Sequence, residues 1–244
     1  MENWINQPFE GTHIQREVTQ TEVKSFFSSV YSYMFLGLIV SGLVSWYLAS
    51  SGLFIEWFIN KDTESISPLF YVVAFSPLAF VFLINAKYKS FSKGTLILLF
   101  IVFSALMGAS FSSIFFVYSI GSIASTFFIS AAAFGAMAVL GYTTSVDLTK
   151  MGSLLFMLFI GIFIASIVNM FMQSEMMGYV ISIIGVFVFT GLTAWEMQRL
   201  KAVASDSSID GETRQKLSLI GGMSLYILFV NLFLSLLNLL GGRD

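Results

Sequence analysis

The chain has 244 residues, of which 57% are hydrophobic and only 11% charged, and it contains 27 Phe, 3 Pro and no Cys. This composition is typical of a membrane protein and excludes an ordinary soluble core. The absence of Cys excludes disulfides, thiol catalysis and thiolate metal sites, and the formal net charge of −2 identifies no partner.

Apolar runs of about 20 residues, the length that an α-helix needs to cross a bilayer, recur along the chain. We predict an all-α bundle of seven transmembrane helices, forming one membrane domain over residues 28–240 behind a polar tail at residues 1–27. The predicted spans are residues 28–49, 67–86, 94–118, 120–141, 152–172, 178–198 and 217–240. The third and fourth nearly touch, so we expect their turn within residues 118–122. The tail carries no signal-peptide pattern, so the first span should be an uncleaved anchor.

Lys and Arg residues are distributed unevenly between the two sides of the predicted membrane spans. Ten of the twelve Lys and Arg residues fall in the tail or in the loops after the second, fourth and sixth spans, and the opposite side holds only Lys61 and Arg243. The positive-inside rule therefore predicts a cytoplasmic N-terminus and a C-terminus outside, which requires an odd number of spans. We expect a multi-pass protein of the cytoplasmic (inner) membrane, with the lipid bilayer as its first partner.

Small residues recur at four-residue spacing in several spans, and such rows let helix backbones approach closely. Tight packing within the bundle is the favoured interpretation, ahead of a dedicated dimerisation site. The rows are Gly37 with Ser41, Gly108 with Ser112, Ala131 with Gly135, Ala132 with Ala136, and Gly161 with Ala165.

Signatures of membrane enzymes are missing from the spans. The only His is His13, in the tail, so no Ser-His pair and no HExxH zinc site can form within the membrane. An aspartyl intramembrane protease needs two facing acids, and only Glu196 is placed inside a span. The last span lacks the Lys that a retinal Schiff base requires. We expect no enzymatic activity, no cofactor, no metal site and no nucleic-acid partner.

Glu196, in the segment FTGLTAWEMQRLK, is the residue most open to a functional interpretation, because a carboxyl inside a membrane is costly without a partner. It stands at the cytoplasmic end of its span. One interpretation is an interfacial carboxylate that reaches water or pairs with Arg199. The other is a titratable gate, in which a change of charge with pH switches a helix contact. The same helical row also contains Ser182, Gly185, Phe189 and Thr193.

A polar stripe follows one face of the last span, with members spaced three and four residues apart. The stripe consists of Gly221, Ser224, Leu228, Asn231, Ser235 and Asn238. This face should look into the bundle, where hydrogen bonds between helices are favoured over a pathway lining. In the fifth span Asn169 is expected to make a packing contact. Just before that span Asp147 should cap a helix start.

Residues 141–240 resemble the transmembrane Bax-inhibitor-motif family in its bacterial branch. The resemblance rests on GYTTSVDLTKMGSLLF, SIIGVFVFTGLTAWEMQRLK and SLYILFVNLFLSLLNLL, and the first half matches mainly in span pattern and in YSYMFLGL. It implies a seven-helix bundle. Members of the family act as pH-sensitive calcium leak channels, suppress cell death in eukaryotes, or modulate a membrane-bound protease in bacteria.

The resemblance also implies two acids that share a proton and gate a pore. One matches Glu196, with Glu in place of Asp, and the other belongs to a pattern LYxDFxNLF in the last span. This chain has LYILFVNLF, so Leu228 stands where the family has its second acid. A sensor built on two coupled carboxyls therefore does not transfer. Calcium needs clustered oxygen ligands, and the spans offer few.

Two functions remain open from the sequence. One is a leak channel for calcium or protons, with pH sensitivity altered by the loss of the second acid. The alternative is a non-conducting regulator that binds a membrane-bound protease or another membrane complex, with Arg16 and Lys24 of the tail as a handle. A secondary transporter is less favoured, because Pro77 is the only Pro inside a span.

Overall fold

The computed structural model describes residues 18–60, 63 and 65–242. His13 and Arg16 of the predicted tail, and Lys61 and Arg243 of the side with little positive charge, lie outside the described residues. Predictions that concern these four residues stay predictions.

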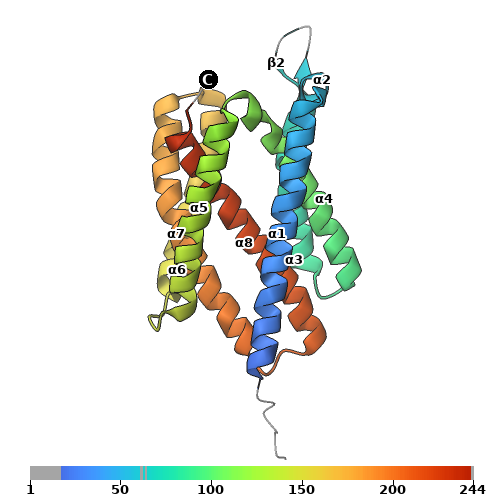
Figure 1. Cartoon of the computed structure of the whole chain (residues 1–244), viewed down its shortest axis with the longest axis vertical. Helices are drawn as coiled ribbons and strands as arrows, with labels where there is room; N and C mark the ends of the chain where they lie inside the picture. Colours follow the sequence, from blue (N-terminus) through green and yellow to red (C-terminus); the bar gives the residue numbers. More distant parts are fainter. Residues whose placement is uncertain (1–17, 61–62, 64, 243–244) are drawn as a thin grey trace, which may run out of the picture.

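Within the described ranges, seven helices are long and apolar enough to cross a membrane, which confirms the predicted all-α class and the number of spans. A short helix, a two-stranded hairpin and a 3-10 turn complete the fold (Figure 1). In chain order the elements are α1 (Gln20–Ser50), α2 (Leu53–Phe58), β1 (Ile59–Asn60), β2 (Ser65–Ile66), α3 (Pro68–Lys87), α4 (Lys93–Phe111), η1 (Ser112–Phe116), α5 (Ile120–Thr143), α6 (Thr149–Met172), α7 (Glu175–Ser205) and α8 (Gly211–Leu240).

Capping residues set helix ends that apolar length does not reveal. Helix α1 begins at Gln20, ahead of its apolar run, because Thr19 and Glu22 form a reciprocal capping box. Helix α5 begins at Ile120, where the Ser119 hydroxyl accepts a hydrogen bond from the backbone N–H of Ser122 at 3.2 Å. The turn before α5 therefore falls at residues 117–119, at the near edge of its predicted place.

The predicted third span is α-helical only as far as Phe111. Three serine hydroxyls near its end donate to carbonyls one turn back: Ser110 to Leu106, Ser112 to Ala109 and Ser113 to Ser110. Such bonds compete with the helical backbone pattern. The chain tightens into the 3-10 turn η1 at this point.

Helix α8 is the centre of the bundle and crosses it diagonally (Figure 1). It packs against α1, α4, α5 and α7, whereas α3 packs on α4 and α6 on α7 at the periphery. Tyr226 of α8 is fully buried, while Phe82 of α3 and Phe171 of α6 are each about three-quarters exposed. These outward faces are suited to lipid, because exposed apolar side chains such as Phe82 and Phe171 meet lipid tails that are as apolar as they are.

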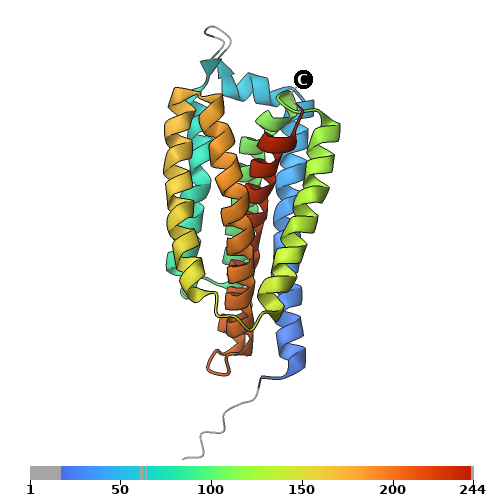
Figure 2. The same ribbon diagram turned by 90° about the vertical axis from the view of Figure 1, so that its left-hand side faces the viewer.

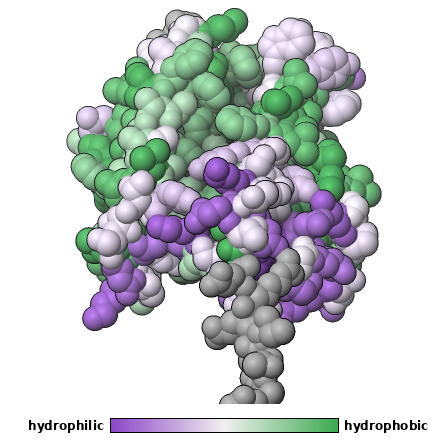
Figure 3. Space-filling model, turned by 60° about the horizontal axis from the view of Figure 1, so that its bottom comes forward, coloured by the Kyte–Doolittle hydropathy of each residue, from purple (hydrophilic) through white to green (hydrophobic). Residues whose placement is uncertain are grey.

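The start of α1 and the end of α8 lie at opposite ends of the bundle (Figure 1, Figure 2). Viewed from the end where α1 begins, hydrophilic side chains gather around the loops and apolar surface lies beyond them (Figure 3). The α3–α4, α5–α6 and α7–α8 connections all lie at this end, which we call the basic end, and its cations include Lys87, Lys89, Lys93, Lys150, Lys201 and Lys216.

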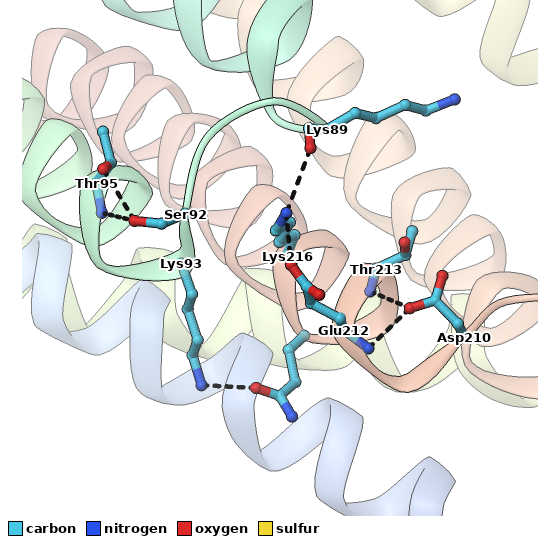
Figure 4. Close-up of polar contacts among 9 residues, drawn as sticks. Lys89, Ser92, Lys93, Thr95, Asp210, Glu212, Thr213 and Lys216 are labelled. Atoms are coloured by element: carbon cyan, nitrogen blue, oxygen red, sulfur yellow. Dashed lines mark hydrogen bonds and ion pairs between the residues drawn. The ribbon is translucent and has the colours of Figure 1, made fainter.

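Polar contacts fix the α3–α4 turn to the start of α8 (Figure 4). Lys93 Nζ donates to Gln215 Oε1 at 3.0 Å. Lys216 Nζ lies 2.9 Å from Glu212 Oε1 and donates to the Lys89 carbonyl at 3.4 Å. At the basic end, hydrogen bonds therefore join the α3–α4 connection to helix α8.

Candidate functional site

Helices α7 and α8 run antiparallel and pack along a shared interface, which we call the seam. The row that contains Glu196 on α7 and the polar stripe on α8 both lie on it. At the crossing, a Cβ built on Gly185 would lie 2.6 Å from Ser235 Oγ, so the glycine lets the two helices approach more closely than a larger residue would without a shift of Ser235. Nearer the basic end, a Cβ on Gly221 would lie 2.6 Å from Leu200 Cδ2. These two contacts set the register of the seam and turn the two rows toward each other.

The end of the seam away from the basic end is held by neutral hydrogen bonds. Asn238 Nδ2 donates to Ser182 Oγ at 2.8 Å and to the Gly178 carbonyl at 3.2 Å. The Tyr118 hydroxyl donates to Asn238 Oδ1 at 3.5 Å. Hydrogen bonds between membrane helices contribute about 0.6 kcal/mol each on average, so this cluster is a modest link.

Glu196 is 3% exposed and lies near the basic end of the seam. Arg199, one turn further along the same helix, holds it in a two-pronged contact: Nε donates to Oε2 at 2.8 Å and Nη2 to Oε1 at 2.6 Å. The Arg199 side chain is 42% exposed and the Glu196 side chain 4%. A planar guanidinium matches a carboxylate in this geometry. The buried charge thus has its counterion on its own helix, and that counterion reaches the surface.

With Gly185 against Ser235 and Gly221 against Leu200, the antiparallel register implies that Thr193 lies near the level of Leu228 and Glu196 near the level of Ser224. Thr193 is fully buried, and its hydroxyl donates to the Phe189 carbonyl of the same helix at 2.7 Å. Leu228 and Ser224 are half-buried. Within the described residues Glu196 is the only buried acid, so hydrocarbon occupies the position where the family resemblance implies a second carboxyl.

A groove of about 460 Å³ opens between α6 and α8 in the half of the bundle away from the basic end, with α7 as its floor. It brings together Asn169, Asn231 and Ser235, three of the residues predicted as lining or interhelical contacts. Thr193 and Ser224 are not part of its lining. Its other polar lining residues are Ser166, Ser182 and Asn238.

The donors of this groove are largely satisfied within their own segments. Asn231 Nδ2 donates to the Ile227 carbonyl at 2.8 Å, and Ser235 Oγ donates to the Asn231 carbonyl at 2.8 Å. Asn169 Oδ1 accepts from the Ser174 backbone N–H at 3.1 Å and so closes the α6–α7 turn. The polar side chains that line the groove are therefore held in place by the protein's own backbone.

Two polar residues at the basic end act on the α5–α6 connection. Asp147 Oδ1 accepts from the backbone N–H of Thr149, the first residue of α6, at 2.9 Å. Hydrogen bonds from Thr149 lower the pKa of Asp147. Sequence reasoning missed Gln198, whose Oε1 accepts from the Leu148 N–H at 2.8 Å and whose Nε2 donates to the Val146 carbonyl at 2.7 Å. No periodic signal could identify it, because its partners lie about fifty residues away in sequence.

No group of three or more His, Cys, Asp or Glu residues that could hold a metal ion occurs in the part of the chain that the structure describes. The arrangement consists of seven apolar helices, a central α8, one buried acid and a polar groove on one seam. It defines an α-helical multi-pass membrane protein.

Comparison with known proteins identifies the family. The family model described as "Inhibitor of apoptosis-promoting Bax1" matches residues 23–244, and the chain belongs to this Bax inhibitor-like family. The predicted resemblance is confirmed, and it extends over the first half of the chain.

Bacterial relatives match over nearly the whole chain. Inner membrane protein YbhL of Escherichia coli K12 is 40% identical over 222 residues, which cover 91% of this chain and 93% of that protein. An uncharacterized protein of Borreliella burgdorferi is 39% identical over 218 residues, with 89% and 92% covered. An uncharacterized membrane protein of Streptococcus pyogenes serotype M1 is 32% identical over 231 residues, with 93% and 97% covered.

Proposed function

We propose that the protein is a regulated ion leak of the cytoplasmic membrane, passing protons or small cations along the α7–α8 seam. The observation that carries this proposal is the buried Glu196 carboxylate at one end of the seam, paired with the partly exposed Arg199, while the other half of the seam holds the polar groove. A charged pair at membrane depth is a functional feature by default, because its burial costs free energy. The groove has room for on the order of ten waters at about 30 Å³ each.

The step between the groove and the acid is the gate in this proposal. Phe189 and Asn231 are the lining residues of the groove that lie furthest along the seam toward Glu196. Beyond them the register puts Thr193 against Leu228, and the Leu228 side chain interrupts the polar line. Conduction then requires α7 and α8 to separate at this level, so the form described is the closed one.

Protons or monovalent cations fit the seam better than calcium does. Calcium takes six to eight oxygen ligands, commonly from several carboxylates. The described residues contain no cluster of acids, and Glu196 is already engaged by Arg199. Calcium permeation therefore has the weaker physical support, although the family resemblance implies it.

Flux measured in liposomes tests the proposal. Purified protein should pass protons above the level of empty liposomes, and Glu196→Gln should change the pH dependence of that flux. Glu56→Gln, which removes the same charge from an exposed position on α2, is the matched control and should leave the flux unchanged. No flux above empty liposomes at any pH, for protons, potassium or calcium, would contradict a leak.

The orientation that we propose puts the basic end in the cytoplasm, following the positive-inside rule. The naming of YbhL as an inner membrane protein supports the same membrane for this chain. Because the chain has no Cys, single-cysteine variants have no background. Ser65→Cys should react with an impermeant maleimide on intact cells and Ser207→Cys only after permeabilisation. The opposite pattern would invert the topology.

A second candidate function is a non-conducting regulator that binds a membrane-bound protease or another membrane complex. The observation that favours it is the broad apolar surface of α3 and α6, since each of these helices packs mainly on one neighbouring span. Absence of flux, together with co-purification of one membrane protease that is lost when residues 1–20 are deleted, would favour this function over the leak. Lys24 would remain in that truncated chain, while Arg16 would be removed.

A further inference from the structure

A cleft of about 370 Å³ lies between α1 and α5 at the basic end of the bundle. Its walls include Phe27 and Tyr31 of α1 and Tyr142 of α5, its floor is Met197 of α7, and Lys24 lies on its lining. The groove between α6 and α8 is on a different pair of helices, so the two sites are separate.

The cleft is held in shape by contacts among its own lining residues. The rings of Phe27 and Tyr142 meet nearly at right angles with centroids 5.2 Å apart, which joins α1 to α5. The Tyr31 hydroxyl donates to Met197 Sδ at 3.7 Å, which joins α1 to α7. Such contacts mean that an occupant would find the site already formed, and pre-formed sites lose less entropy on binding.

Two lysines lie at the cleft, Lys24 on its lining and Lys201 against Tyr142. Lys24 is exposed on the first turns of α1, and Lys201 Nζ donates to the Tyr142 carbonyl at 2.9 Å and lies 5.1 Å from the centre of its ring. Among residues 18–60, 63 and 65–242, no carboxylate forms an ion pair with either lysine. Neither cation is therefore neutralised by a direct ion pair within the described chain.

We propose that this cleft binds one anionic phospholipid, with the headgroup phosphate at Lys24 and an acyl chain along Phe27, Tyr31 and Met197. Basic pockets between transmembrane helices are suited to anionic headgroups. The tyrosines mark the level of the membrane interface, where a headgroup and the start of its chain meet. This site does not depend on whether the protein conducts ions.

Other occupants fit the same geometry less well. A soluble anion would gain little from the apolar walls, which present mainly carbon atoms. A partner helix is about 10–12 Å wide with its side chains and needs a broader groove than one closed by the Phe27–Tyr142 contact. A phospholipid uses both features, since its phosphate meets the cation and its chain meets the apolar wall.

Lipid titration followed by native mass spectrometry tests the site. The purified full-length chain, stripped of lipid in mild detergent, is titrated with phosphatidylglycerol or phosphatidylcholine that carry the same acyl chains. We expect phosphatidylglycerol to bind more tightly, and Lys24→Gln to weaken it about fivefold, the effect of one lysine near an anionic headgroup. Lys150→Gln removes the same charge from an exposed position outside the cleft and should have no effect.

A second variant tests the walls without altering charge. Val139 lines the cleft but is 63% exposed, so Val139→Trp should fill the opening without disturbing the core, and retained thermal stability checks this. It should weaken both lipids. Equal affinity for the two lipids, or an equal loss with Lys150→Gln and Lys24→Gln, would overturn the proposal. A dimer that dissociates with Val139→Trp would also overturn it, because a second copy would then occupy the cleft.

Discussion

Replacing Arg199 should destabilise the protein more than replacing Glu196, although the two residues form a single ion pair. The Glu196 side chain is 4% exposed, so Arg199→Gln leaves a carboxylate buried without its cation. Such a break costs about 3–5 kcal/mol when both partners are buried. Because the Arg199 side chain is 42% exposed, water already weakens the pair, and we expect a loss of about 2 kcal/mol.

Glu196→Gln should cost about 1 kcal/mol or less. The released guanidinium can turn to water, and the Gln amide fills the same space as the carboxyl. Unfolding in mixed micelles with increasing SDS measures both losses. Arg199→Lys, which keeps the charge but loses the two-pronged contact, should lie between wild type and Arg199→Gln. If Glu196→Gln costs as much as Arg199→Gln, then Glu196 stabilises the fold through another partner and the asymmetry argument is wrong.

Three further predictions concern packing, pH and the missing acid. Gly108→Ala, which forces a Cβ against the α1 backbone, should lower the SDS-unfolding free energy by about 1–3 kcal/mol, whereas Gly135→Ala, with nothing within 4 Å, should change it by less than about 0.5 kcal/mol. Hydrogen bonds from Thr213 lower the pKa of Asp210 below its ordinary value of 3.8, so its stabilisation is present above that value and is lost as the pH falls through the folded pKa. The loss of thermal stability in Asp210→Ala should accordingly be full at neutral pH and shrink as the pH is lowered below 3.8, and a constant loss would contradict it. Leu228→Asp should change the pH dependence of the liposome flux, because it adds a titratable carboxyl to the α8 face of the seam, about one helical turn from the level of Glu196, and the same change in Leu228→Asn would show that titration is not its cause.

The number of spans could be predicted from the sequence because bilayer thickness imposes one length on every crossing helix. Helix ends were less accessible, since they depend on caps such as Thr19 and Ser119. The 3-10 end of the third span was also missed. Its serines suit a helix in apolar surroundings, and only their back-bonding to the carbonyls of Leu106, Ala109 and Ser110 shows that the backbone tightens there.

Small-residue spacing identified helix faces without identifying which of them are in contact. Gly37 and Gly108 follow the same spacing as Gly135 and Gly161. A Cβ on Gly37 would lie 2.8 Å from Phe100 Cζ, and one on Gly108 would lie 2.8 Å from Ser41 Cα, whereas Gly135 and Gly161 face open space. In a membrane the lipid-facing and protein-facing sides are both apolar, so the polarity contrast that orients a soluble helix is missing.

Sequence reasoning could find the part of the candidate site that consists of a residue type costly to bury in a membrane. It could not find the parts that depend on which helices lie side by side. Glu196 stands out because an acid in a span needs an explanation. The α1–α5 cleft has no comparable signal, since Tyr31 and Tyr142 are ordinary residues until the fold brings their helices side by side. Helical spacing already puts Lys24 and Tyr31 on one face of α1, but only the three-dimensional structure brings Tyr142 of α5 against that face.

The location of the charges on the seam bears on where α7 and α8 can separate. Glu196 and Arg199 belong to the same helix, so their attraction does not tie α7 to α8. The links across the seam are neutral: Asn238 donates to Ser182 at the end away from the basic end, and Gly185 packs closely on Ser235. A second acid at the position of Leu228 would add a polar link between the two helices in the half nearer the basic end. This chain has Leu there and so lacks that link. If the seam opens as we propose for the leak, separation should therefore begin at the half nearer the basic end, with Glu196 keeping its counterion as α7 moves.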